Sequence, residues 1–106
     1  MKIVTDTAQF IGGWFIGNFE PSLLKTENFE VAIKEYKKGD YEISHFHKLS
    51  KEFTVILVGT VKMNEIEYKH GDIVVVNEYE KTNFECLEDC ITVVIRNKSI
   101  KGDKYD

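Results

Sequence analysis

The sequence lacks several features that would assign a protein to a broad class at once. It holds two cysteines and one proline among 106 residues, and no apolar run approaches the roughly 18 residues that a membrane span needs. Residues 1–6 also lack the long apolar stretch of a secretory signal peptide. We therefore expect a cytoplasmic protein with no membrane partner.

Positive charge is also scarce. Lysine and arginine together number 14 against 18 aspartates and glutamates, which gives a formal net charge of −4, and the basic residues form no stripe. Proteins that bind nucleic acid usually cluster their basic residues on one face. Nucleic acid is therefore excluded as an expected partner.

The two cysteines, Cys86 and Cys90, are separated by three residues. This spacing is not the CxxC of redox or zinc sites, and the chain has no second pair. We interpret both cysteines as small buried apolar residues. The spacing also permits a disulfide between the two cysteines across the turn at 87–89.

The order of apolar runs and turn residues predicts an all-β protein. Short runs rich in Val, Ile, Thr, Phe and Tyr alternate with turn signals about every ten residues, and the only helical turn expected is at 6–10, with Asp6 as its N-cap. We expect one domain over 1–106, with a core at about 30–96, N-terminal strands and loops at 1–29, and a tail at 97–106.

The run 53–58 is apolar at nearly every position, whereas a strand with one solvated face alternates. Alternation would place Thr54 and Ile56 on one face and Phe53 and Val55 on the other. Both faces of the strand would then carry apolar side chains that must be shielded from water. In so short a chain we expect a second copy to shield one of these faces, and we predict a homodimer.

The candidate chemistry lies in a pair of histidines. His45 and His47 are two residues apart, so a strand would present both on one face. Glu52 follows a predicted turn at 49–51, and a hairpin would bring its carboxylate beside the two imidazoles. Two neutral imidazoles and one carboxylate are a competent site for a first-row metal.

The spacing of this segment resembles the first motif of the cupin superfamily. That motif reads glycine, five residues, H-x-H, three or four residues, glutamate, six residues, glycine. The chain has Gly39, His45, His47, Glu52 and Gly59 in these positions. The resemblance implies a single-domain cupin-type double-stranded β-helix, a small jelly-roll barrel of two antiparallel sheets.

The second cupin motif is degenerate in this chain. Only Gly71 is kept, and Thr82 stands where the family has its third histidine ligand. The resemblance therefore implies that His45, His47 and Glu52 alone hold a divalent metal, such as Fe, Mn, Zn or Ni, with waters completing the shell. Such a site would bind its metal weakly and leave positions open for a small-molecule ligand.

Five further residues are candidates for the pocket wall or for the missing ligand. Strand alternation predicts that Thr82 and Phe84 face the barrel interior together, and Tyr41 would lie at the pocket rim. Tyr79 and Glu80 lie close to the missing histidine's place in the motif.

Three functions stay open on this reading. The preferred one is a metal-dependent enzyme that acts on a sugar or a small acid. A second follows from the resemblance of His45-Phe46-His47-Lys48 to metal-free isomerases of sugar nucleotides, in which His45 and His47 would be the catalytic acid and base. The third is a non-catalytic module that binds a saccharide. One of Trp14 and Phe15 should face outward, where it would pack on a partner subunit, the preferred role, or stack on a sugar ring.

Overall fold

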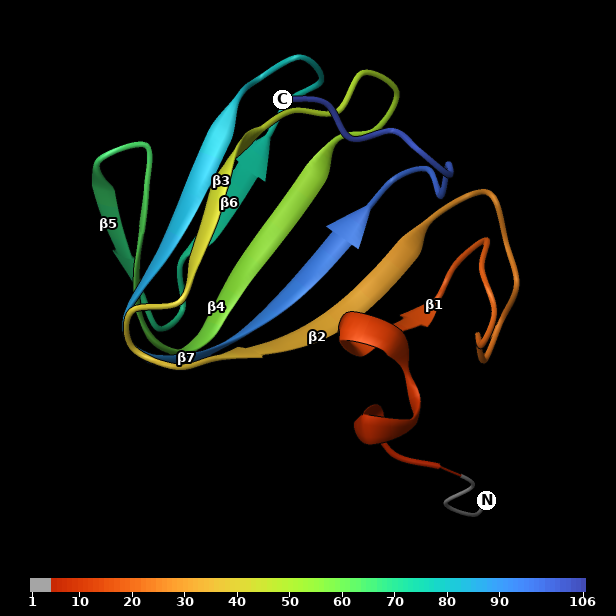
Figure 1. Ribbon diagram of the computed structural model, residues 1–106, viewed down its shortest axis with the longest axis horizontal. Helices are drawn as coiled ribbons and strands as arrows, with labels where there is room; N and C mark the ends of the chain where they lie inside the picture. The colour runs from red at the N-terminus through yellow and green to blue at the C-terminus, as the bar shows by residue number, and fades with distance from the viewer. Residues whose placement is uncertain (1–4) are drawn as a thin grey trace.

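The computed structural model describes residues 5–106, and β-strands form most of it (Figure 1). Two 3-10 helices come first, η1 (Thr7–Gln9) and η2 (Ile11–Gly13). The Asp6 carboxylate accepts a hydrogen bond from the Ala8 N–H at 3.0 Å, which confirms the predicted cap. The strands are β1 (Trp14–Ile16), β2 (Glu30–Tyr36), β3 (Tyr41–His45), β4 (Glu52–Met63), β5 (Ile66–Lys69), β6 (Ile73–Val76) and β7 (Thr82–Arg96).

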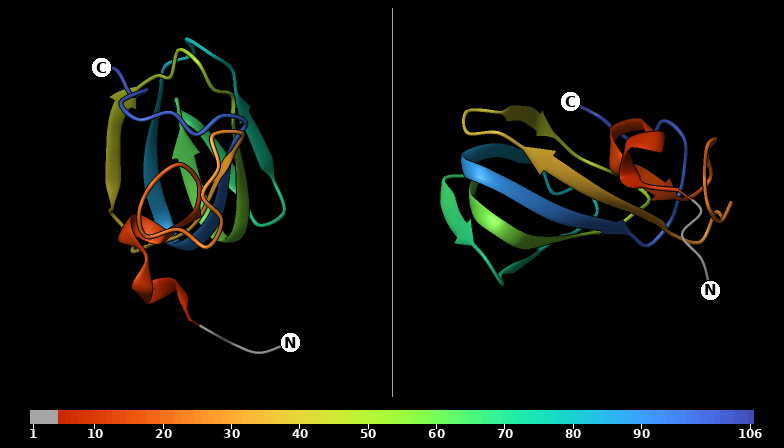
Figure 2. Two further views of the ribbon diagram at one scale, coloured as in Figure 1. Left: turned by 90° about the vertical axis from the view of Figure 1, so that its right-hand side faces the viewer. Right: turned by 90° about the horizontal axis from the view of Figure 1, so that it is seen from below.

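Within the described part of the chain, the strands pair antiparallel to one another and wrap around an interior (Figure 2). The wrapping depends on β4 and β7, which are long, pair with each other and change partners along their length. The first half of β4 pairs with β6 and its second half with β5, while β7 pairs first with β3 and then with β2. The predicted all-β barrel is thereby confirmed. Within residues 5–106 there is no helix long and apolar enough to cross a membrane.

The change of partners along β4 takes place at Gly59. Its φ is +88°, and a Cβ built on it would lie 2.4 Å from the Asp89 carbonyl oxygen and 2.8 Å from the Cys90 Cβ. Only glycine has both the freedom to adopt this φ and the small size that lets the two strands approach. The second glycine of the motif thus marks the bend by which β4 passes between the two sides of the barrel.

The two sides of the bend have different interiors. An apolar cluster fills one end of the barrel, and it comprises Ile56, Val61, Met63, Val76, Phe84, Cys86 and Cys90. Both cysteines are free thiols, and burial is the main cause that raises the pKa of Cys90 to about 12. Buried polar residues, among them Glu30, His47 and Thr54, occupy the other end. The buried ionisable side chains Glu30 and His47 thus lie away from the apolar cluster.

Candidate functional site

Three charged residues lie side by side across three strands at the polar end. Arg96, the last residue of β7, is paired with Glu30 of β2 on one side and with Glu52 of β4 on the other. Its Nη1 donates to Glu30 at 2.8 Å and its Nε donates to Glu52 at 3.1 Å. The side chains of Arg96 and Glu52 are only 20% and 12% exposed, so this ion pair is largely screened from water.

A tryptophan and a lysine border this charged row. The Arg96 guanidinium lies 4.9 Å from the centre of the Trp14 ring, and the Lys34 ammonium lies 5.2 Å from it. Burial lowers the pKa of Lys34, and the Glu42 carboxylate partly offsets this effect. A cavity of about 240 Å³ opens beside the row and is lined by Ile11, Trp14, Phe19, Glu20, Pro21, Glu30 and Arg96. Its wall is therefore partly aromatic, from Trp14 and Phe19, and partly charged, from residues that include Glu30 and Arg96.

His47 is fixed in the interior by the C-terminal segment. Its Nδ1 donates to the carbonyl oxygen of Asp103, and the Asp103 carboxylate in turn accepts hydrogen bonds from the backbone N–H groups of Lys48 and Leu49. The carbonyl can only accept, so the proton of neutral His47 lies on Nδ1. Its Nε2 has no hydrogen-bond partner within residues 5–106, although His47 is only 4% exposed.

His45 is held in the same tautomer by its own strand. Its Nδ1 lies 3.0 Å from the Ile43 carbonyl oxygen, which again leaves Nε2 as the nitrogen with a free lone pair. The ring centroids of His45 and His47 are 5.3 Å apart, and the rings meet edge to face. The two imidazoles thus lie next to each other, as expected for residues that share one face.

The electrostatic surroundings keep His47 neutral. Burial is the main cause that lowers its pKa below the ordinary value of 6.5, and the nearby positive charge of Arg96 lowers it further. The hydrogen bond to Asp103 and the Glu52 carboxylate oppose the shift without reversing it. An imidazole that stays neutral near pH 7 can accept a hydrogen bond or a proton.

Glu52 does not offer a free carboxylate to this pair. Its Oε1 accepts from Arg96, and its Oε2 accepts from the Thr54 hydroxyl at 3.2 Å. Within residues 5–106, no three histidine, cysteine, aspartate or glutamate side chains are gathered so that they could hold a metal ion. The donor set as arranged does not fit a metal, and the three-ligand site of His45, His47 and Glu52 stays a prediction.

The other residues singled out in the sequence take different positions. Thr82 lies directly opposite His45 in the β3–β7 pairing, whereas Phe84 is buried in the apolar core with its ring 4.6 Å from that of Tyr36. Tyr41 and Tyr79 are both exposed.

Four important residues of the polar end were not identified from the sequence. Glu30 and Lys34 flank buried Ala32 at alternate positions of β2, so two charges on the face that Ala32 directs inward were a usable signal. Arg96 continues the inward-facing alternation of β7 after Thr92 and Val94. No local pattern marks Asp103.

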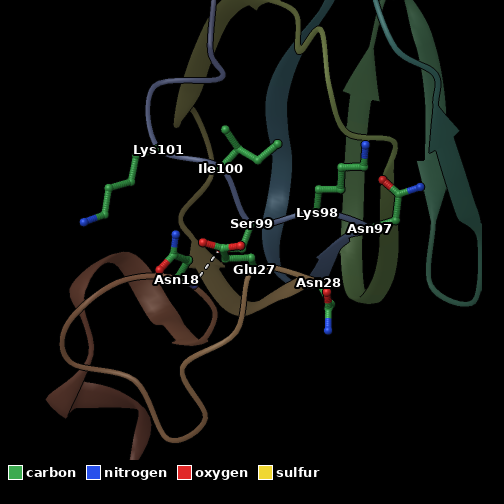
Figure 3. A pocket seen from close by; sticks show the side chains of 8 residues that line it. All are labelled: Asn18, Glu27, Asn28, Asn97, Lys98, Ser99, Ile100 and Lys101. Carbon is green, nitrogen blue, oxygen red and sulfur yellow. Dashed lines mark hydrogen bonds between the residues drawn. The ribbon is translucent and has the colours of Figure 1, made fainter.

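A second hollow lies between the β1–β2 connection and the segment after β7 (Figure 3). It measures about 630 Å³ and is lined by Asn18, Glu27, Asn28, Asn97, Lys98, Ser99, Ile100 and Lys101. Ser99 accepts from the Asn18 N–H at 2.7 Å and donates to Glu30 at 2.8 Å. This buried serine therefore anchors the carboxylate that pairs with Arg96.

No protein-family model matches the sequence, and no curated protein matches it. Solved structures do resemble the fold. KdgF from Halomonas sp. matches with a TM-score of 0.66 at 14% identity, covering 71% of this chain and 74% of that one. An uncharacterised double-stranded β-helix protein from Klebsiella pneumoniae gives 0.66 at 21%, covering 76% of each chain. Oxalate decarboxylase from Bacillus subtilis gives 0.67 at 15%, covering 76% of this chain but 24% of that one.

These likenesses concern the fold, because the sequences are distant. They agree with the glycine, histidine and glutamate spacing at 39–59 and with the wrapped antiparallel strands. The chain therefore has the double-stranded β-helix fold that is also found in cupin proteins.

Proposed function

We propose that the protein binds a small polar molecule at the His45–His47 pair, and that neutral His47 accepts a hydrogen bond or a proton from it. The observation that carries the proposal is the buried Nε2 of His47, which has no partner within residues 5–106. A buried polar atom without a partner costs about 1–3 kcal/mol. A ligand that donates to Nε2 would recover this free energy.

The chemistry of the pair indicates the class of ligand. Both Nδ1 atoms face backbone carbonyls, so both Nε2 atoms present lone pairs and the ligand must supply donors. Two adjacent hydroxyl groups of a sugar would meet this requirement. His45 is only partly buried, so the ligand can approach from its side.

The test is a thermal-shift and calorimetric screen in buffer that contains a chelator. Monosaccharides, sugar acids and nucleotide sugars would be compared with deoxy analogues that lack one of two adjacent hydroxyls. We expect at least one compound to raise the melting temperature, since a ligand at about 100 times its Kd adds about 2.7 kcal/mol of stability. The deoxy analogue should bind more weakly.

Matched variants separate this site from others. His45→Ala and His47→Ala should abolish the shift, whereas His70→Ala should retain it because His70 is exposed and contacts the Leu57 carbonyl instead. Binding that persists in both pocket variants, or the absence of binding by every compound, would contradict the proposal.

A second candidate is divalent-metal binding through His45, His47 and Glu52. The observation that favours it is the contact of each Nδ1 with a backbone carbonyl, because metal-binding histidines are usually oriented by such a bond. The engagement of Glu52 by Arg96 stands against it.

A further inference from the structure

We propose that Arg96 takes the position of the metal charge beside Glu52, so that wild-type protein is a cupin whose histidine pair works without a divalent ion. The cupin motif supplies Glu52 as a ligand, but in this chain its Oε1 accepts from Arg96 at 3.1 Å and its Oε2 accepts from Thr54. A metal ion would therefore compete with a hydrogen-bond donor at either oxygen of this carboxylate.

The backbone register places Arg96 there. Arg96 is the pairing partner of Glu52 across β7 and β4, so the two side chains leave neighbouring strands at the same level of the barrel. Because alternation directs both into the interior, the guanidinium meets the carboxylate without leaving its strand.

Two further contacts restrain the guanidinium. It donates to Glu30 at 2.8 Å, and Glu30 is itself fixed by the buried Ser99 hydroxyl at 2.8 Å. The Trp14 ring lies 4.9 Å from it. An arginine held on two sides and against an aromatic ring is poorly placed to move aside for a cation.

The positive charge of Arg96 and the lack of a third histidine ligand also oppose metal binding. A divalent ion beside Glu52 would lie close to the Arg96 cation, and repulsion between like charges is strong where water is largely excluded. Thr82, opposite His45, supplies no imidazole in place of the third histidine. Of the ligand positions of the cupin motifs, only the two histidines are therefore left to bind a metal.

The experiment is to titrate wild type and Arg96→Gln with Ni²⁺ by calorimetry and with Co²⁺ by visible absorption. We expect weak binding by wild type and binding on the order of tenfold tighter by Arg96→Gln, because glutamine removes the cation and releases Glu52. In Arg96→Gln, a second change of His47→Ala should remove the gain. Lys34→Gln is the matched control, because it removes a nearby cation that makes no hydrogen bond to Glu52. It should leave the affinity near that of wild type.

Two results would overturn the inference. One is tight stoichiometric binding of Ni²⁺ by wild type that His47→Ala abolishes. The other is an Arg96→Gln variant that folds and shows no gain over Lys34→Gln. If Arg96→Gln does not fold, Arg96→Met decides, because methionine removes the positive charge and both hydrogen bonds but keeps a long apolar side chain beside Trp14. A gain in Arg96→Met supports the inference, and an affinity equal to that of wild type contradicts it. The thermal shift by sugars is a separate readout, so its failure would not be confused with this one.

Discussion

His47 is the residue on which the proposed chemistry depends, because the fold defines the state of both its ring nitrogens. Asp103 fixes the proton on Nδ1, and burial leaves Nε2 without a partner within the described part of the chain. The groups that influence its charge are Arg96, Glu52 and His45. A neutral imidazole in this setting suits a ligand that donates hydrogen bonds.

The lowered pKa of His47 makes a prediction about stability. Its pKa is below 6.5 in the folded protein, so as the pH falls the unfolded chain takes up a proton first. The free energy of unfolding should therefore decrease as the pH falls through 6.5 toward the folded pKa, by about 1.4 kcal/mol for each unit between the two values. Urea denaturation of wild type between about pH 7.5 and about pH 5 measures this.

The contribution of His47 is isolated by comparison with His47→Gln, which does not titrate. The variant should lose less stability than wild type over the same pH range, whereas His70→Gln should follow wild type. Equal losses in wild type and His47→Gln would show that His47 does not titrate with a lowered pKa.

At the scale of elements, the barrel depends on the bends of β4 and β7. Each strand changes partners along its length, and the polar end is formed where β2, β7 and β4 run together. The site is thus made by long-range pairing of strand ends and not by one loop. Gly59 and the chain near Asp89 approach closely at the bend.

Gly59→Ala should be strongly destabilising. The new Cβ would meet the Asp89 carbonyl oxygen at 2.4 Å, and its backbone would be strained at a φ of +88°. We expect a loss of about 3 kcal/mol or more in the free energy of unfolding, measured by chemical denaturation. Gly39→Ala is the control, because its φ is +95° but no atom lies within 4 Å of the new Cβ. It should cost only about 1–2 kcal/mol, and equal losses in the two variants would rule out close packing as the cause.

At the scale of the whole molecule, one outer face of the barrel is apolar. The side chains that alternate with the interior residues of β2, β7, β4 and β6 form two cross-strand rows of four residues each. The rows are Val31–Ile95–Phe53–Val75 and Ile33–Val93–Val55–Ile73. Contiguous apolar faces of this kind usually mark an interface.

We expect two copies of the chain to associate through this face, as the apolar run 53–58 predicts. Ile73→Lys should dissociate the dimer because Ile73 is 62% exposed on the face, and lysine there would have to be desolvated in the interface. Light scattering after size-exclusion chromatography should give twice the chain mass for wild type and the single mass for the variant. Ile66→Lys, at a residue that is 56% exposed on β5 and outside the face, should remain dimeric. A monomeric wild type would contradict the prediction.

The sequence by itself determined the fold, because its signals are local. Alternation and turn residues predict strands, and the motif from Gly39 to Gly59 places a histidine pair before the strand that begins near Glu52. The proximity of His45 and His47 followed from their spacing alone.

Only the tertiary structure decided what surrounds that pair. Arg96 reaches Glu52 across 44 residues of sequence and Glu30 across 66, and His47 reaches Asp103 across 56. Such partners are set by strand register and by the path of the C-terminal segment, which no local pattern encodes. The sequence thus supplied the Glu52 carboxylate, and the register supplied the arginine that holds it.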